Sequence, residues 1–157
     1  MPIVHAATER IAACLGTGTS VFVGTIASSG VPTCCRAIAV RSDDGLATAT
    51  IDVPIATSRD TLANLATTHR LAVVVTKPVE HMSVQLKGRS STARLARTDE
   101  EQFVRTRLEG LADVLDAIGV PRRVTRSFAH WPAFAIEMQV EEIFEQTPGP
   151  KAGTRLR

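Results

Sequence analysis

Residues 11–35 form a run of 25 positions without a charged side chain. The run is interrupted by four glycines and one proline, at Gly16, Gly18, Gly24, Gly30 and Pro32. The apolar blocks left between them, Ile11–Leu15 and Val21–Val23, are too short to cross a bilayer as a helix. We therefore expect this run to belong to a water-soluble domain and not to cross a membrane.

The first half of the chain has the pattern of consecutive strands. Residues 20–27 are rich in β-branched and aromatic side chains, residues 28–30 read Ser-Ser-Gly, and residues 33–41 are again extended in pattern. This arrangement predicts a hairpin, in which Arg36 shares a strand face with Ile38 and Val40. An Asp-Asp-Gly turn at 43–45 then predicts a third strand over 46–51.

Both kinds of periodicity occur in the rest of the chain. We predict helices over 4–15, 57–66 and about 98–118, and strands over 70–76, 81–87 and 133–140. Thr98 and Glu101 have the spacing of a capping box at the start of the long helix. Gly88 predicts a bend or bulge, and the alternation of the last strand breaks at Glu142. Because residues 71–75 are continuously apolar, both faces of their strand are expected to be covered.

These elements predict a mainly β fold, an antiparallel barrel of about six strands with flanking helices. The length of 157 residues suits one domain, and the 44% apolar content provides a core. We therefore assign residues 1–157 to a single domain. Its Pro- and Gly-rich end, residues 146–157, is predicted to be an irregular tail.

Composition excludes several classes of function. The net charge of +2, the absence of Tyr and the 4% aromatic content disfavour nucleic-acid binding. Cys14, Cys34 and Cys35 lack metal-site spacing, so neither a metal nor a disulfide is expected. Residues 1–10 have no basic signal-peptide region, which favours a cytoplasmic protein without a membrane partner.

The order of short motifs between residues 20 and 95 is more specific than any one of them. A strand contains Arg36-Ala37-Ile38-Ala39-Val40-Arg41, a Gly turn leads to a strand with Ala49-Thr50, and Ser58-Arg59 opens a helix. An apolar strand and the segment Ser83-Val84-Gln85-Leu86-Lys87-Gly88 follow. This order resembles the pyridoxamine 5′-phosphate oxidase-like, FMN-binding split-barrel family.

The resemblance implies a six-stranded antiparallel split barrel with flanking helices. It also implies a homodimer with FMN at the subunit interface and a small-molecule substrate for a flavin-dependent oxidoreductase. The cofactor-binding residues that it implies are Arg36, Ala37, Ile38, Ala39, Val40, Arg41, Thr50, Ser58, Arg59, Ser83, Gln85 and Lys87. The catalytic residues and the substrate are left open.

The physical chemistry of Arg36, Ser58 and Arg59 agrees with a phosphate site. Arg59 would add a guanidinium to the positive end of a helix dipole, and Ser58 would add a hydroxyl. Ser58 as a simple helix cap and Arg59 as a solvated charge are the alternatives. Arg36 on an apolar strand face calls for an anionic partner. Gln85 and Lys87 fit a solvated strand face as well as a site.

Three other functions share the predicted fold. One is a flavin-binding or carrier protein without turnover. The other two replace FMN by deazaflavin F420 or by haem, and haem would need His81 or His130 as its ligand. A visible spectrum would separate flavin from haem, and turnover with a reductant would separate an enzyme from a carrier.

Overall fold

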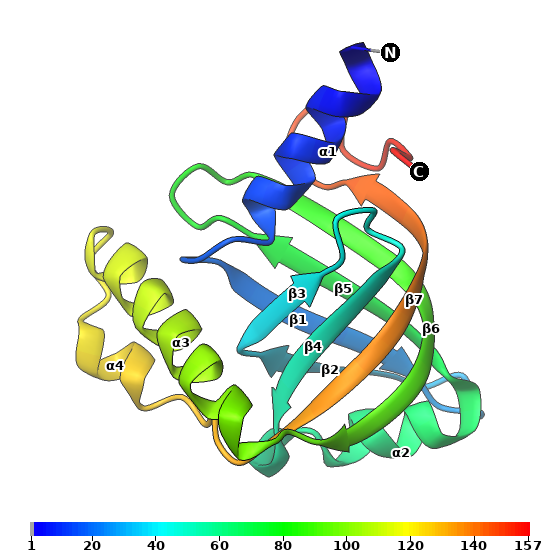
Figure 1. Ribbon diagram of the computed structural model, residues 1–157, viewed down its shortest axis with the longest axis vertical. Coiled ribbons are helices and arrows are strands. Elements are labelled where there is room, and N and C mark those ends of the chain that lie inside the picture. The colour runs from blue at the N-terminus through cyan, green and yellow to red at the C-terminus, as the bar shows by residue number, and fades with distance from the viewer. Residues whose placement is uncertain (1) are drawn as a thin grey trace.

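The computed structural model describes the backbone of residues 2–157 and the side chains of residues 8–157 (Figure 1). Its helices are α1 (Pro2–Cys14), α2 (Arg59–Thr68), α3 (Glu101–Asp116) and α4 (Arg122–Arg126), with 3-10 turns at Ile55–Thr57 and Thr98–Glu100. Its strands are β1 (Ser20–Ile26), β2 (Pro32–Ala37), β3 (Ala39–Ser42), β4 (Thr48–Pro54), β5 (Arg70–Thr76), β6 (Ser83–Leu95) and β7 (Ala133–Glu145). The predicted helices and strands are thus all present, with shifted ends.

One antiparallel sheet of seven strands curls into a barrel, in the order β2-β1-β5-β6-β7-β4-β3. The predicted fold class, mainly β and of the split-barrel type, is confirmed, but the strand count of six was too low by one. The predicted strand over 33–41 bends at Ile38 into β2 and β3, which form the two outer edges of the sheet. At this bend the chain passes directly from one edge of the curled sheet to the other.

The bend reverses the alternation of side chains along the segment. Ala37 and Val40 both lie in the barrel core, whereas Ile38 packs outside it against Val104 and Leu108 of α3. Arg36 and Val40 therefore face opposite sides of the barrel wall, and the prediction that they share a face was wrong. At Ile38 the backbone leaves the regular strand conformation, and the side chain is buried under α3.

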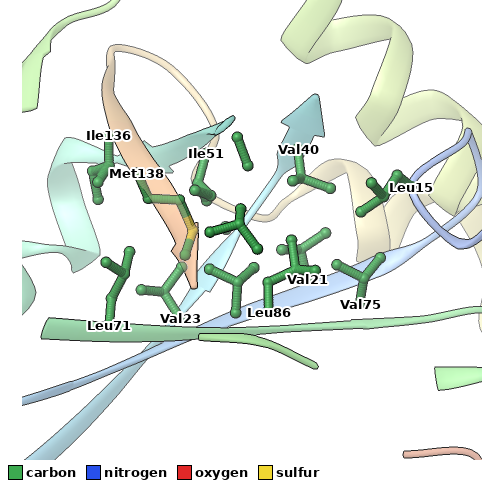
Figure 2. Close-up of a cluster of buried hydrophobic side chains, with 14 of the residues drawn as sticks. Leu15, Val21, Val23, Val40, Ile51, Leu71, Val75, Leu86, Ile136 and Met138 are labelled. Carbon is green, nitrogen blue, oxygen red and sulfur yellow. The ribbon is translucent and has the colours of Figure 1, made fainter. Parts of the chain in front are cut away.

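Aliphatic side chains from all seven strands fill the barrel, and α1 and α2 add a few more. Figure 2 shows them meeting from opposite walls of the sheet. Those with the least exposure include Val23, Ile51, Val53, Val73, Val75, Val84 and Ile136. Alternation along β5 buries Leu71, Val73 and Val75, while Ala72 and Val74 on its outer face are half-buried. The expectation that both faces of this strand are covered is therefore met on one face only.

The bulge predicted at Gly88 is present. The β6–β7 register shifts between Lys87 and Gly88, and a Cβ at Gly88 would lie 1.9 Å from the carbonyl oxygen of Gln139. Glu141 is the unpaired residue on β7, one position before the predicted break at Glu142. Glycine is required here because only a residue without a side chain allows the two backbones to approach so closely.

Two local features differ from expectation, one before α3 and one in the C-terminal tail. The capping interaction before α3 joins the Glu100 carboxylate to the backbone N–H of Arg97, at 2.7 Å, instead of Thr98 to Glu101. The tail forms bends over 147–149 and turns over 150–153, and it then pairs with β7, where Phe144 bridges to Arg155. Among the residues described, no helix has the length and apolar character to span a membrane.

Candidate functional site

Arg36 lies on the outer face of β2 between two aromatic rings. Its guanidinium carbon is 4.4 Å from the ring centroid of Phe22 and 4.8 Å from that of Phe128, and Nη1 donates to Ser20 Oγ at 3.0 Å. Arg36 forms no ion pair with any of the described side chains. Partial burial lowers the pKa of this guanidinium, as expected for a cation held without a counter-ion.

The start of α2 carries two further groups suited to an anion. Ser58 is fully buried, and its hydroxyl neither caps the helix nor has any other hydrogen-bond partner. Arg59, in the first turn, is exposed, and no ion pair of the side chains seen in the structure involves it. Ser58 therefore stands at the N-cap position of α2, as expected, but its hydroxyl makes no capping hydrogen bond. The helix N-terminus, the hydroxyl and the guanidinium together form a donor set without an acceptor.

The first turn of α2 packs against β2, next to Arg36. Thr61 Oγ1 lies 3.2 Å from Cys35 Sγ inside the barrel end, and Asn64 Nδ2 donates to Thr25 Oγ1 at 3.1 Å. Cys35 faces inward and contacts Thr61, whereas Arg36, the next residue, faces outward. The groups at the start of α2, an unpartnered hydroxyl and a guanidinium, are donors of the kind that a phosphate monoester takes, and Arg36 on β2 is a further cation of this kind.

Arg41, the last residue of the predicted cofactor strand, is engaged elsewhere. Its guanidinium donates to Asp52 Oδ2 at 3.0 Å and to Glu100 Oε1 at 2.7 Å. Arg94 makes two more hydrogen bonds to Glu100, of 2.8 and 2.9 Å. Arg41 is therefore part of a charge network between the barrel wall and the start of α3, and its cation is already neutralised.

The two carboxylates of this network titrate in opposite directions. Burial raises the pKa of Asp52 to about 6, although the neighbouring Arg41 acts against this shift. Hydrogen bonds from Arg94 lower the pKa of Glu100 to about 2. The second carboxylate oxygen of Asp52, Oδ1, is buried without a hydrogen-bond partner.

Arg107 was missed by the sequence analysis. Its guanidinium carbon lies 4.9 Å from the ring centroid of Phe103, at the same distance as that of Arg41. Burial lowers the pKa of Arg107, and the charge of Arg41 lowers it further. Both arginines line a cavity of about 340 Å³ between α1, the β3–β4 turn and α3. The four-residue spacing of Phe103 and Arg107 is the signal that sequence reasoning could have used.

Ser83, Gln85 and Lys87 lie on the outer face of β6, because Val84 and Leu86 between them point into the core. Ser83 is buried and shares a hydrogen bond of 2.8 Å with Thr76. The Lys87 ammonium lies 4.5 Å from the ring centroid of Phe144. Lys87 is exposed, as the solvated-face interpretation expects, whereas Gln85 is half-buried.

The strand register places Arg36 and Gln85 in one row across the outer face. Arg36 is opposite Phe22, Phe22 is opposite Val74, and Val74 is opposite Gln85. The row is apolar in its middle and polar at both ends. The outer face of β2, β1, β5 and β6 thus carries four of the predicted residues on one surface, Arg36, Ser83, Gln85 and Lys87, of which Ser83 is buried.

The other predicted residues are distributed differently. Ala37 and Val40 belong to the barrel core, and Ile38 is covered by α3. Ala39 is buried and pairs with Asp52 in the β3–β4 ladder. Thr50 is half-buried, and in the ladders it lies opposite Arg41 of β3 and Glu137 of β7. For these residues, cofactor contact remains a prediction.

Comparison with known proteins places the fold. No protein-family model matches the chain, and no curated protein matches it. Among solved structures, General Stress Protein 26 from Bacillus anthracis has a TM-score of 0.53 at 8% identity, covering 88% of this chain and 92% of that protein. An F420 reductase has a TM-score of 0.51 at 12% identity, covering 83% and 93%.

A third structure carries the family description itself. It is a protein from Clostridium acetobutylicum related to general stress protein 26 of B. subtilis, of the pyridoxinephosphate oxidase family. Its TM-score is 0.50 at 15% identity, and the match covers 90% of this chain and 86% of that protein. Likeness at such identities establishes the fold alone. At that level the resemblance to the pyridoxamine 5′-phosphate oxidase-like split-barrel family is confirmed.

Proposed function

We propose that this protein binds FMN and is a flavin-dependent oxidoreductase. The observation that carries the proposal is the set of donors without acceptors at the start of α2 and on β2. Ser58 Oγ is buried without a partner, and neither Arg36 nor Arg59 has a carboxylate partner among the described side chains. A split barrel with unmatched phosphate donors is what an FMN-binding protein of this fold requires.

Different residues would bind the phosphate and the ring system of the cofactor. Arg59 and Ser58 would hold the phosphate at the N-terminus of α2, and Arg36 would supply the second cation. Gln85 and Ser83 would present hydrogen-bonding groups from the outer face of β6. When bound, FMN supplies hydride or electron transfer, and the chain supplies orientation and the exclusion of water.

Arg107 suggests the chemistry of the substrate. It is half-buried, it has no carboxylate partner in the part of the chain that the structure describes, and it lines a cavity of about 340 Å³. An Arg held in this way favours an anionic group on a small molecule, such as a carboxylate or phosphate. We propose such a substrate for the oxidoreductase.

The outer face of the sheet supports the proposed homodimer. Phe22 and Ile26 are 38% and 39% exposed, and Ala72 and Val74 beside them are half-buried. Contiguous apolar surface of this kind is typical of a protein interface. A second copy placed on this face would cover the apolar middle of the row between Arg36 and Gln85, leaving its polar ends for two bound flavins.

The alternative functions differ from an FMN-dependent enzyme in the cofactor or in turnover. F420 would use the same fold and a similar phosphate site, and a carrier would bind FMN without turnover. Haem is less well supported, because both ring nitrogens of His130 are engaged, with the Phe128 carbonyl at 2.9 Å and Arg105 at 3.3 Å. His81 is exposed at the β5–β6 turn. The cytoplasmic location remains a prediction from the sequence.

A titration with FMN and riboflavin tests the proposal, because the two ligands share the ring system and differ in the phosphate. We expect FMN to bind about ten- to a hundred-fold more tightly than riboflavin, since charge-assisted hydrogen bonds hold its phosphate. Equal affinities for FMN and riboflavin would contradict the proposed phosphate site. Failure of both ligands to bind would contradict flavin binding altogether. Reduction of the bound FMN by NADPH, with turnover on an added acceptor, then separates an enzyme from a carrier.

A further inference from the structure

Residues at the end of β7 and the start of the tail contact each of the predicted site residues on the outer face of β6. Thr147 Oγ1 accepts a hydrogen bond of 3.0 Å from the backbone N–H of Ser83. Gln146 Nε2 donates to Gln85 Oε1 at 3.3 Å, and the ring of Phe144 lies under the Lys87 ammonium. All three predicted flavin-contacting residues of β6 thus have a partner from this segment.

The backbone of Gln146 is fixed independently of its side chain. Its N–H donates to the Ser83 carbonyl at 2.9 Å, which continues the β6–β7 ladder beyond Glu145. The next N–H, of Thr147, donates to Glu145 Oε1 at 2.9 Å. The Gln146 side chain therefore projects from an ordered backbone, and its one hydrogen bond is to Gln85.

The hydrogen bond between the two amides determines what Gln85 offers to a ligand. A glutamine side chain has one acceptor oxygen and one NH₂ group with two donors. The oxygen of Gln85 accepts from Gln146, and its Nε2 has no hydrogen-bond partner among the described residues. Gln85 is half-buried on the outer face, at one end of the row that begins at Arg36. It is thus held as a donor.

We propose that Gln146 is a positioning residue that holds the amide of Gln85 as a hydrogen-bond donor to the ring system of the flavin. This inference rests on the proposed function. The acceptor atoms of the ring gain electron density on reduction, so a fixed donor stabilises the reduced cofactor more than the oxidised one. Gln146 therefore influences the reduction potential without touching the flavin.

The test is a double-mutant cycle of the full chain loaded with FMN. We expect Gln85→Leu to weaken FMN binding by about three- to ten-fold, the effect of one lost hydrogen bond. A preference of that size for the reduced form equals a fall of about 15–30 mV in the two-electron potential. Gln146→Leu should shift both quantities in the same direction, and should add almost nothing in the Gln85→Leu background.

Gln139→Leu is the matched control, because Gln139 is exposed on the same strand and makes no side-chain hydrogen bond to a described residue. It should leave affinity and potential unchanged. Gln146→Met retains length and packing without the amide, and it serves as the second variant if Gln146→Leu folds poorly.

The outcomes separate the two proposals. Failure of the wild-type protein to bind FMN would overturn the proposed function and this inference with it. If FMN binds, an unchanged potential in both Gln146 variants would overturn the positioning role alone. Additive effects of Gln85→Leu and Gln146→Leu would also overturn it, because Gln146 would then act independently of Gln85.

Discussion

Arg41 Nη1 donates a hydrogen bond of 3.0 Å to Oδ2 of Asp52, a carboxylate with 0% exposure. The pair joins β3 to β4 beneath the start of α3, and Glu100 binds the other side of the same guanidinium at 2.7 Å. Arg41 thus serves two carboxylates, one of them fully desolvated. Burial of a charged pair requires that every remaining lone pair be satisfied, and Asp52 Oδ1 is not.

The free energy of unfolding should depend on pH through the titration of Asp52. Its pKa rises from 3.8 to about 6 on folding, so the folded state holds this proton more tightly than the unfolded chain. The contribution of Asp52 to the free energy of unfolding therefore decreases as the pH rises from about 4 to 6. Asp52→Asn, which does not titrate, should gain stability relative to the wild type over this range.

Chemical denaturation at several pH values measures the difference. The change with pH is the test, because loss of the ion pair with Arg41 adds a further cost to the variant. Glu100 works in the opposite sense: its pKa of about 2 contributes stability that is lost as the pH falls from about 4.5 towards 2. A stability difference between wild type and Asp52→Asn that stays constant from pH 4 to 6 would contradict the raised pKa.

The phosphate site predicts a ligand-specific loss of affinity. Arg59→Ala and Arg36→Ala should each weaken FMN binding by about ten- to a hundred-fold, because each removes a charge-assisted contact. Riboflavin affinity should change far less, since it lacks the phosphate. Arg123→Ala, on the exposed face of α4, is the control. A titration in which Arg59→Ala weakens both ligands equally would place Arg59 away from the phosphate.

Gly88 gives a prediction that is independent of any ligand. A Cβ there would lie 1.9 Å from the carbonyl oxygen of Gln139 and 3.0 Å from its carbonyl carbon. Because both atoms belong to the backbone of β7, relief requires the strands to separate. Gly88→Ala should lower the free energy of unfolding by about 3 kcal/mol or prevent folding.

Gly24→Ala is the matched strand control for this prediction. Its nearest neighbour, the Ala72 carbonyl oxygen, would be 3.9 Å from the new Cβ, an ordinary contact distance. We expect a change within about 1 kcal/mol. Equal destabilisation of the two variants, measured by urea denaturation, would show that the close approach at the bulge is not the cause.

Local signals in the sequence were sufficient for most of the secondary structure. Gly88 predicted the bulge because an isolated glycine inside a strand pattern is itself a signal in the sequence. Ile38 shows the limit: residues 36–41 contain no turn signal, yet β2 and β3 separate at Ile38, whose side chain packs against α3. Contacts between distant segments decide such a bend, and they leave no periodic signal.

In the candidate site, too, local patterns were predicted from the sequence and contacts between distant segments were not. Ser58 and Arg59 were found because a helix start is a local pattern, and the structure confirms that they begin α2. The capping interaction was misplaced by one residue, since Arg41 and Arg94 draw the Glu100 carboxylate into their network. The engagement of Arg41 by Asp52 joins residues eleven positions apart on neighbouring strands. Spacing alone does not show which of several charges will meet in this way.

The apolar outer face leads to a prediction about assembly. Ile26 is 39% exposed on this face, whereas Ile118, 52% exposed, lies beyond the end of α3 and outside the sheet. If the face is the dimer interface, Ile26→Lys places a charge within it and should convert a dimer into a monomer of 16.8 kDa. Ile118→Lys should leave the dimer intact. FMN affinity should fall together with the dimer, because the cofactor is proposed to lie between the two chains. Light scattering at micromolar concentration measures the mass, and a wild-type monomer that binds FMN would contradict the proposed interface.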